Sequence, residues 1–177
     1  SIYYFQNKKY LLAGLWGVVA QLAKPPGILL FAAYILAIFV PLIKNAVTTN
    51  KNILNLIQVK KYWPILFIPL SLVLVFSIFG IQLKDFWAYF HSGDNVHLMF
   101  PPFSVFNYSA PWVGTFWLEE IIFIYLLGVL GICRLYQEKL TNYFYFAITF
   151  SLPLLFVAHR DLMRYALPVV PFLLLGY

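Results

Sequence analysis

Long runs of hydrophobic residues alternate with short polar stretches along the whole chain. Inside these runs the apolar residues are continuous and lack the apolar-polar alternation of a membrane β-strand. A backbone surrounded by lipid must satisfy its hydrogen bonds within each segment, so continuous apolar runs predict α-helices. We therefore predict an all-α fold, a polytopic transmembrane helical bundle. Its six hydrophobic segments are expected at about 10–23, 28–43, 62–82, 118–136, 143–158 and 165–177.

The lengths of these segments are uneven. A helix needs about 20 apolar residues to cross a hydrocarbon core of roughly 30 Å, and only 62–82 and 118–136 approach that length comfortably. One long external loop is predicted at 83–117. With no soluble domain or repeat visible, residues 1–177 are predicted to form a single transmembrane domain. The chain lacks an initiator Met and ends within an apolar run, so we expect a fragment of a larger polytopic protein.

Composition supports the membrane interpretation. Hydrophobic residues make up 63% of the 177 residues and charged residues only 10%, whereas soluble domains carry about a quarter charged residues. The formal net charge of +6 would suit a polyanion. However, the basic residues lie mostly at the ends of the hydrophobic segments, which favours membrane topology and argues against a nucleic-acid partner.

The loops can be sorted onto alternate sides of the membrane, and the more basic side is predicted to be cytoplasmic. This orientation predicts a multi-pass integral protein of a bacterial plasma membrane or endoplasmic reticulum, with its active face external or luminal. The cytoplasmic side receives Lys8, Lys9, Lys44, Lys51, Lys60, Lys61, Arg134 and Lys139. The external side receives Lys24, Lys84, Arg160 and Arg164.

A short segment and a helix-breaking sequence meet at Lys24. The 14 residues of 10–23 would make only about 21 Å of helix, and Pro25, Pro26 and Gly27 then oppose its continuation. Irregular backbone at membrane depth is tolerated where it lines a protein or water cavity, into which Lys24 would point. The alternative is a simple turn whose Lys24 side chain snorkels to the headgroups.

The predicted external loop, 83–117, is rich in aromatic residues and contains no obvious regular element. His91, Asp94 and His97 are residue types that bind metals, so a divalent metal is left open, beside a purely structural turn at Asp94. Aromatic rings near a carboxylate also suit a sugar, which makes Asp94 and His97 substrate-binding candidates. A plain aromatic belt at the membrane interface explains the rings as well. We assign no metal ligands and no other cofactor.

A polar stretch near the end of the chain, His159–Tyr165, carries two arginines. If it is helical, Arg160 and Arg164 share one face, and Asp161 can reach Arg164. Paired guanidinium groups suit a phosphate or diphosphate because each can donate two parallel hydrogen bonds. The alternative is headgroup contact with an Asp161–Arg164 ion pair. We include His159, Arg160 and Arg164 among the substrate-binding candidates.

Two stretches resemble a known family. The run from Leu12 through Ala20 to Lys24-Pro25-Pro26-Gly27, followed by an apolar segment, resembles a stretch of the class C superfamily (GT-C) of integral-membrane glycosyltransferases. The nearest group is the mannosyltransferase-like one related to phosphatidylinositol-glycan V enzymes. The late stretch with Arg164-Tyr165, Pro168 and Pro171 resembles the same group's Arg-Tyr signature followed by Pro. The match covers both ends of the chain, and the middle loop agrees only in character.

The resemblance implies a hexosyltransferase. Such an enzyme moves a sugar, such as mannose, from a polyprenyl- or dolichyl-phosphate donor to a lipid, glycan or protein acceptor. It also implies a catalytic Asp or Glu in an earlier external loop that this chain does not contain, so no catalytic residue is assigned. Lys24 stands where the group usually has Arg. The alternative is a transporter or flippase of an anionic lipid or lipid-linked sugar, although its path would need polar groups through the midplane.

Overall fold

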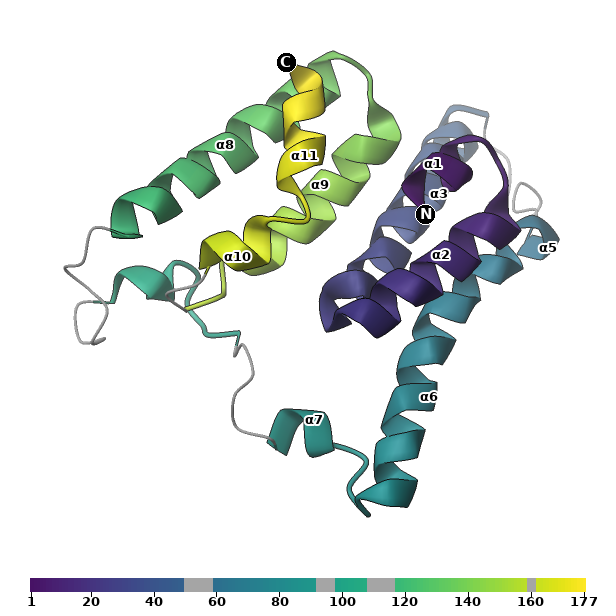
Figure 1. The fold of residues 1–177 in the computed structure, drawn as a ribbon. Coiled ribbons are helices and arrows are strands. Elements are labelled where there is room, and N and C mark those ends of the chain that lie inside the picture. The colour runs from purple at the N-terminus through teal and green to yellow at the C-terminus, as the bar shows by residue number, and fades with distance from the viewer. Residues whose placement is uncertain (50–58, 92–97, 108–116, 159–161) are drawn as a thin grey trace. The chain divides into compact units, whose positions relative to one another are not determined.

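A computed structural model describes residues 1–49, 59–91, 98–107, 117–158 and 162–177. Within these ranges the chain forms helices and turns, with one isolated β-bridge between Leu98 and Val157. The all-α prediction is confirmed for this part of the chain. The chain divides into two compact units, Ser1–Gly93 and Asp94–Tyr177, which are described separately (Figure 1).

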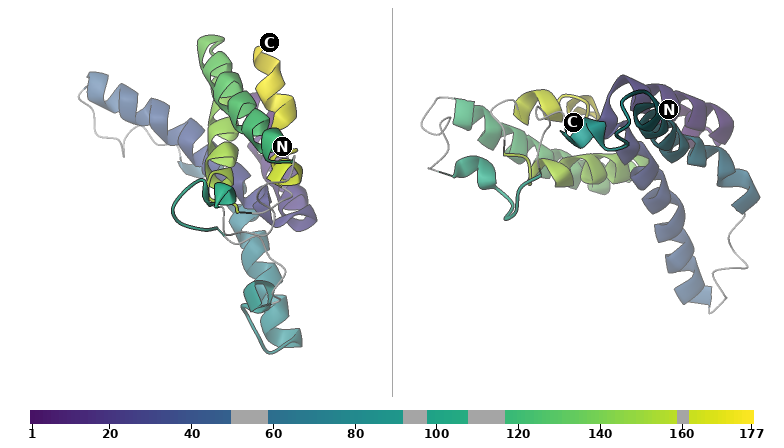
Figure 2. Two further views of the ribbon diagram at one scale, coloured as in Figure 1. Left: turned by 90° about the vertical axis from the view of Figure 1, so that its left-hand side faces the viewer. Right: turned by 90° about the horizontal axis from the view of Figure 1, so that it is seen from below.

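The first unit is built around α2, which packs against η2 and the beginning of α6. Two glycines on one side of α2 allow this close approach: Gly14 faces the backbone of Pro64, and Gly17 faces the side chain of Ile68. Beyond η1, α3 runs away from α2 (Figure 2). The elements are α1 (Ile2–Gln6), α2 (Tyr10–Ala23), η1 (Pro25–Ile28), α3 (Leu29–Thr49), α5 (Val59–Tyr62), η2 (Trp63–Leu66), α6 (Phe67–Gln82) and α7 (Ala88–His91).

The second unit consists of α8 and α9 side by side, with the last turns of the chain packed on them (Figure 1). Gly131 of α8 meets Leu173, because a Cβ at Gly131 would lie 2.7 Å from the Leu173 Cβ. The elements are η3 (Ser104–Phe106), α8 (Trp117–Gln137), α9 (Thr141–Leu154), α10 (Leu162–Ala166), α11 (Val170–Leu173) and η4 (Leu174–Gly176).

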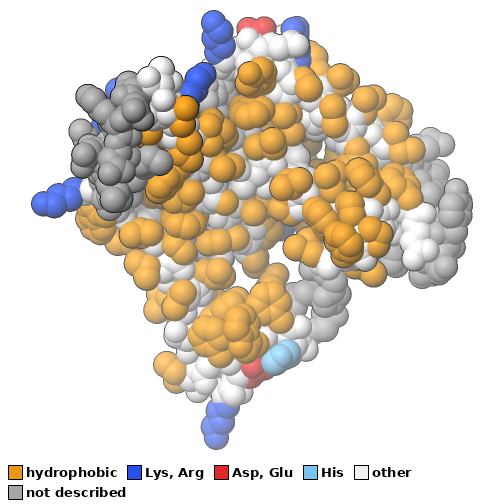
Figure 3. Space-filling view, turned by 180° about the vertical axis from the view of Figure 1, so that it is seen from behind, with side chains coloured by type: hydrophobic (Ala, Val, Ile, Leu, Met, Phe, Trp, Pro, Cys, Tyr) orange, Lys and Arg blue, Asp and Glu red, His pale blue; other side chains and the backbone are white. Residues whose placement is uncertain are grey.

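Three helical stretches are long and apolar enough to cross a membrane. They are Pro25–Thr48, Lys60–Gln82 and Glu120–Gln137, of 24, 23 and 18 residues. Large apolar side chains along them are exposed, such as Val47 at 79% and Ile81 at 80%. Hydrophobic side chains dominate the face drawn in Figure 3. An apolar exterior of this kind suits surrounding lipid, in which hydrophobic side chains need no cover.

Each of the six predicted segments contains helix, but three differ from expectation. The segment 28–43 was expected to end at 43, but α3 continues to Thr49. The segment 165–177 is broken into α10, α11 and η4, since Pro168 and Pro171 cannot donate the hydrogen bonds that a continuous helix needs. The segment 143–158 ends as helix at Leu154, directly after Pro153. The loop 83–117 was expected to lack regular elements, and this is wrong, because it contains α7 and η3.

Candidate functional site

Lys24 occupies the break between α2 and η1. Its backbone is extended, with φ −155° and ψ 129°. The Lys24 N–H donates to the carbonyl of Ala20 at 3.1 Å, and the Lys24 carbonyl accepts from the Gly27 N–H at 2.8 Å. A Cβ at Gly27 would lie 2.6 Å from Cα of Gln21, so only glycine lets the turn pack against the end of α2. Lys24 therefore lies in a helix break that is tightly packed against the end of α2, and its side chain is partly exposed.

A buried amide lies one turn before this break. Gln21 is only 5% exposed, and its Oε1 lacks a hydrogen-bond partner within the described part of the chain. A buried, unpaired carbonyl oxygen costs free energy, so it marks a place where a donor from elsewhere would be favourable. Sequence reasoning missed Gln21 because one glutamine in an apolar run carries no motif. The helix break itself, at Lys24, was predicted.

Arg164 lies on α10, the short helix whose apolar face anchors it to the second unit. Leu162 is fully buried in a cluster with Val105, Ile121 and Val157, whereas Arg164 is exposed. The nearby loop is tied to the turn that follows α9, because the Met99 N–H donates to the Phe156 carbonyl at 2.7 Å. The α10 packing thus holds the guanidinium of Arg164 on the surface of the unit, where an anion can reach it.

Not all of the predicted site lies within the described residues. Asp94, His97, His159, Arg160 and also Asp161 lie outside them. Lys24 belongs to the first unit and Arg164 to the second. Among the described residues no group of three His, Cys, Asp or Glu side chains is arranged to hold a metal ion.

A carboxylate–imidazole pair that sequence reasoning did not identify lies at the beginning of the predicted external loop. Nδ1 of His91 lies 2.6 Å from Oδ2 of Asp85, and Oδ1 of Asp85 accepts from the Trp87 N–H at 2.9 Å. The hydrogen bond from His91, followed by that from the Trp87 backbone, lowers the pKa of the Asp85 carboxyl. If the neutral imidazole carries its proton on Nδ1, the exposed ring presents Nε2 as an acceptor.

The same turn carries a cluster of aromatic rings centred on Phe76 of α6. Five rings lie with their centroids between 5.5 and 6.5 Å from that of Phe76. Several of them are exposed, as expected for a belt of rings at a membrane interface. The predicted alternative of a sugar platform uses the four of these rings that lie in the loop 83–117. The five are Phe79, Phe86, Trp87, Tyr89 and Phe90.

Comparison of the chain with models of protein families, with curated proteins and with solved structures finds no match.

Proposed function

We propose that the chain is the later part of a membrane glycosyltransferase that uses a polyprenyl-phosphate sugar donor. The observation that carries the proposal is the Lys24 break, where a cation sits at a tightly packed interruption between two apolar helices. An interrupted helix with a cation suits an anionic ligand at membrane depth, since irregular backbone is tolerated there when it lines a site. The exposed Arg164 on its anchored short helix supplies a second phosphate-binding group.

The proposed topology places all six hydrophobic segments in the bilayer, with the N-terminal residues in the cytoplasm. The three long apolar helices support the membrane part of this proposal. Helix α2, with 14 residues, would stop short of the external surface and leave Lys24 in a recess. In this orientation Lys24 and Arg164 lie toward the same external or luminal side, where the donor headgroup would be bound.

The proposed reaction is direct displacement at the anomeric carbon of the donor sugar. The acceptor hydroxyl oxygen forms the new bond to that carbon, and the bond from the carbon to the carrier phosphate breaks. The carrier phosphate leaves with the bonding electrons, held by Lys24, Arg160 and Arg164. The proton of the acceptor passes to an Asp or Glu from the upstream part of the protein. Asp94, His97 and His159 are proposed to contact the sugar and the acceptor.

Sugar transfer from radiolabelled polyprenyl-phosphate-mannose, measured in membranes that contain the full-length protein, tests this proposal. Replacing Arg160 and Arg164 together by Ala should lower transfer roughly 10²- to 10⁴-fold, because hydrogen bonds to charged groups contribute about 1.5–3 kcal/mol each. Lys24→Ala removes one such group and should lower transfer roughly 10- to 100-fold. Lys44→Ala is the matched control, since it removes one helical lysine from the predicted cytoplasmic side.

Unchanged transfer in the double arginine variant would remove the phosphate role of that pair. Absence of transfer with every polyprenyl-phosphate sugar offered would contradict the enzyme. If the labelled lipid instead crosses vesicle membranes without covalent change, the transporter or flippase is the correct alternative.

A further inference from the structure

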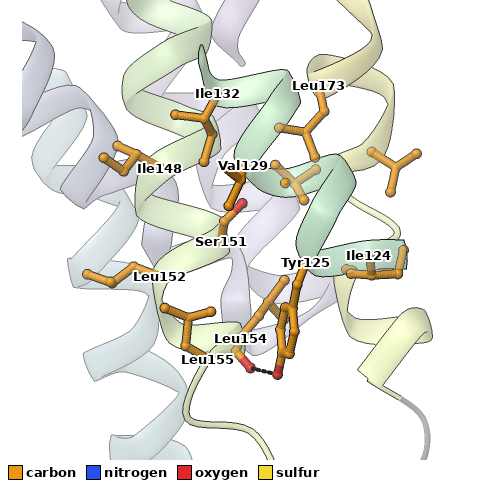
Figure 4. Close-up of a pocket in the computed structure, with 14 residues that line it drawn as sticks. Ile124, Tyr125, Val129, Ile132, Ile148, Ser151, Leu152, Leu154, Leu155 and Leu173 are labelled. Carbon is orange, nitrogen blue, oxygen red and sulfur yellow. Dashed lines mark hydrogen bonds between the residues drawn. The ribbon is translucent and has the colours of Figure 1, made fainter. Parts of the chain in front are cut away.

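The surface between α8 and α9 changes from apolar to polar along the pair of helices. In the middle of the pair, Val129 and Ile132 of α8 and Ile148 of α9 line an apolar space, as Figure 4 shows. The two helices are joined by the short turn 138–140. At this turn a different kind of cavity opens, and its lining residues determine what it can bind.

The cavity at the turn has a volume of about 370 Å³. Five of its seven described lining residues have a side chain that can donate a hydrogen bond, and none of the seven is acidic. The other two, Leu135 and Phe144, are apolar. A wall with several donors, one cation and no carboxylate suits an anion. The five donors are Tyr136, Gln137, Lys139, Thr141 and Tyr145.

The cation of this wall, Lys139, has a left-handed backbone with φ 57°. The Lys139 N–H donates to the Tyr136 carbonyl at 3.1 Å, and the Leu140 N–H donates to the Leu135 carbonyl at 2.9 Å. These two hydrogen bonds form the helix ending in which glycine is the usual residue, because a Cβ is unfavourable in the left-handed region. A lysine therefore stands beside the cavity in a conformation that glycine would adopt more easily.

Lys8 provides a comparison, because it ends α1 in the same way. Its φ is 58°, its N–H donates to the Phe5 carbonyl at 3.0 Å, and the Lys9 N–H donates to the Tyr4 carbonyl at 2.9 Å. A cation after the end of a helix is favourable for the helix dipole, which accounts for Lys8 and Lys139 alike. Lys8 does not line the cavity at the α8–α9 turn, so the two lysines differ in that surrounding.

The donors beside the cavity are not occupied by the protein itself. Within the described part of the chain, Lys139 Nζ forms no ion pair, even with the neighbouring Glu138, which does not line the cavity. The hydroxyls of Tyr136 and Tyr145 likewise have no hydrogen-bond partner there. One ammonium group and two hydroxyls that line the same space can donate together to the oxygens of a phosphate.

The cavity lies where the apolar part of α8 ends. The stretch Glu120–Gln137 is long and apolar enough to cross a membrane, and its last residue, Gln137, is part of the cavity wall. A helix that crosses the bilayer with this stretch brings its end to the level of the headgroups. Arg134 Nη1 lies 3.5 Å from Gln137 Oε1 and adds a second positive charge there. In the proposed topology this is the cytoplasmic side, where anionic lipids attract basic residues.

We propose that this cavity binds the phosphodiester headgroup of an anionic glycerophospholipid. The phosphate oxygens accept hydrogen bonds from Lys139 Nζ and from the hydroxyls of Tyr136 and Tyr145. The acyl chains lie along exposed apolar side chains of α8, such as Val129, two turns before Tyr136. A cavity of about 150 Å³ holds benzene, so this space fits roughly ten to fifteen heavy atoms, enough for a glycerophosphate group. The site goes beyond the proposed transferase function and requires only that Glu120–Gln137 crosses a membrane.

Photo-crosslinking of the purified full-length protein in phosphatidylcholine nanodiscs tests this site. The probe is phosphatidylglycerol that carries a diazirine beside its phosphate, and labelled peptides are mapped by mass spectrometry. We expect labelling within residues 135–145, and unlabelled phosphatidylglycerol should compete for it better than phosphatidylcholine. Lys139→Gly should lower this labelling about fivefold, as expected for one basic residue near anionic lipid. Lys139→Arg keeps the charge and should retain most of the labelling.

Two glycine variants separate binding from folding. Glycine is the preferred residue in the left-handed position, so Lys139→Gly should unfold at or above the wild-type temperature while it loses lipid. Lys8→Gly is the matched control, because it makes the same change in the same kind of helix ending away from the cavity wall. It should also keep or raise the unfolding temperature, and it should leave the labelling of residues 135–145 unchanged.

Three results would overturn the proposal. Unchanged labelling in Lys139→Gly would show that the lysine does not hold the headgroup. Equal labelling by a phosphatidylcholine probe with the same diazirine would show that the cavity does not select an anionic lipid. Labelling of residues 135–145 by a photoreactive soluble glycerophosphate, with none by the lipid probe, would assign the cavity to a soluble phosphate ester.

Discussion

Replacing Gly14 by Ala tests whether the packing of α2 depends on a missing side chain. A Cβ at Gly14 would overlap the Pro64 carbonyl oxygen and lie 2.8 Å from the Pro64 carbonyl carbon. Backbone atoms cannot rotate away, so α2 would have to move from η2 and α6. Overpacking typically costs about 1–3 kcal/mol, with a rigid backbone partner at the upper end. The change to Ala returns up to about 1 kcal/mol of helix propensity, so we expect a net loss of about 2 kcal/mol.

Two other glycines serve as matched controls because they differ only in what surrounds them. At Gly17 the new methyl group would meet the side chain of Ile68, with its Cγ1 at 2.6 Å. A side chain can adjust more than a backbone, so a smaller loss is expected. At Gly128 the methyl group meets open space. Here only the helix propensity changes, and we expect a gain of about 0.5–1 kcal/mol.

Equilibrium unfolding of the full-length protein in mixed micelles, with an increasing fraction of sodium dodecyl sulfate and circular dichroism detection, measures these differences. The expected order of stability is Gly128→Ala, wild type, Gly17→Ala and Gly14→Ala. A Gly14→Ala variant as stable as the wild type would refute the close contact between α2 and Pro64. A Gly128→Ala variant as destabilised as Gly14→Ala would refute the open space beside α8.

Three more changes have defined outcomes. Phe76→Leu removes the central ring of the aromatic cluster, so hydrogen exchange of residues 84–91 should become faster by a factor that reflects about 1–2 kcal/mol. His91→Ala removes the strongest interaction that lowers the pKa of Asp85, so a ¹³C-carboxyl titration should show that pKa rising toward its ordinary value. The His91 contact therefore stabilises the turn above the ordinary carboxyl pKa, and this stability is lost as the pH falls through the lowered pKa of Asp85. Leu162→Ala should destabilise the second unit by about 2–5 kcal/mol, and if Arg164 binds the donor phosphate it should also weaken sugar transfer.

Helix positions followed from local rules where breakers flank an apolar run. The segment 10–23 was predicted with the bounds of α2, because the polar stretch ending at Lys9 and the pair Pro25-Pro26 delimit it. The second segment was predicted to end at 43, but α3 continues to Thr49. Lysine and asparagine are tolerated in helices. The charge of Lys44 therefore indicates where the apolar segment is predicted to reach the membrane surface, but it does not end the helix.

Short helices in loops were missed because their stabilising contacts are specific pairs. Helix α7 is only four residues long, and no apolar period can be read from it. At its beginning, the Asp85 carboxylate accepts a hydrogen bond from the Trp87 N–H. At its end, the His91 ring is hydrogen-bonded to the same carboxylate. Asp85 is a residue type that favours helix starts, and this was the one available signal in the sequence.

The candidate sites show the limit of a sequence whose helices are apolar on all sides. Gly14 and Gly128 look alike in the sequence, since each is a glycine within a hydrophobic run, yet one touches a backbone and the other faces open space. In a soluble protein, polar residues on one face of a helix allow the buried, apolar face to be predicted from the sequence. Surrounding lipid would accept every face of helices as apolar as these, and their rotation would then be set by contacts between helices alone. Ser77 and Ser151 also look alike in the sequence, yet Ser77 donates to the Val73 carbonyl of its own helix, whereas Ser151 Oγ is buried without a partner among the described residues.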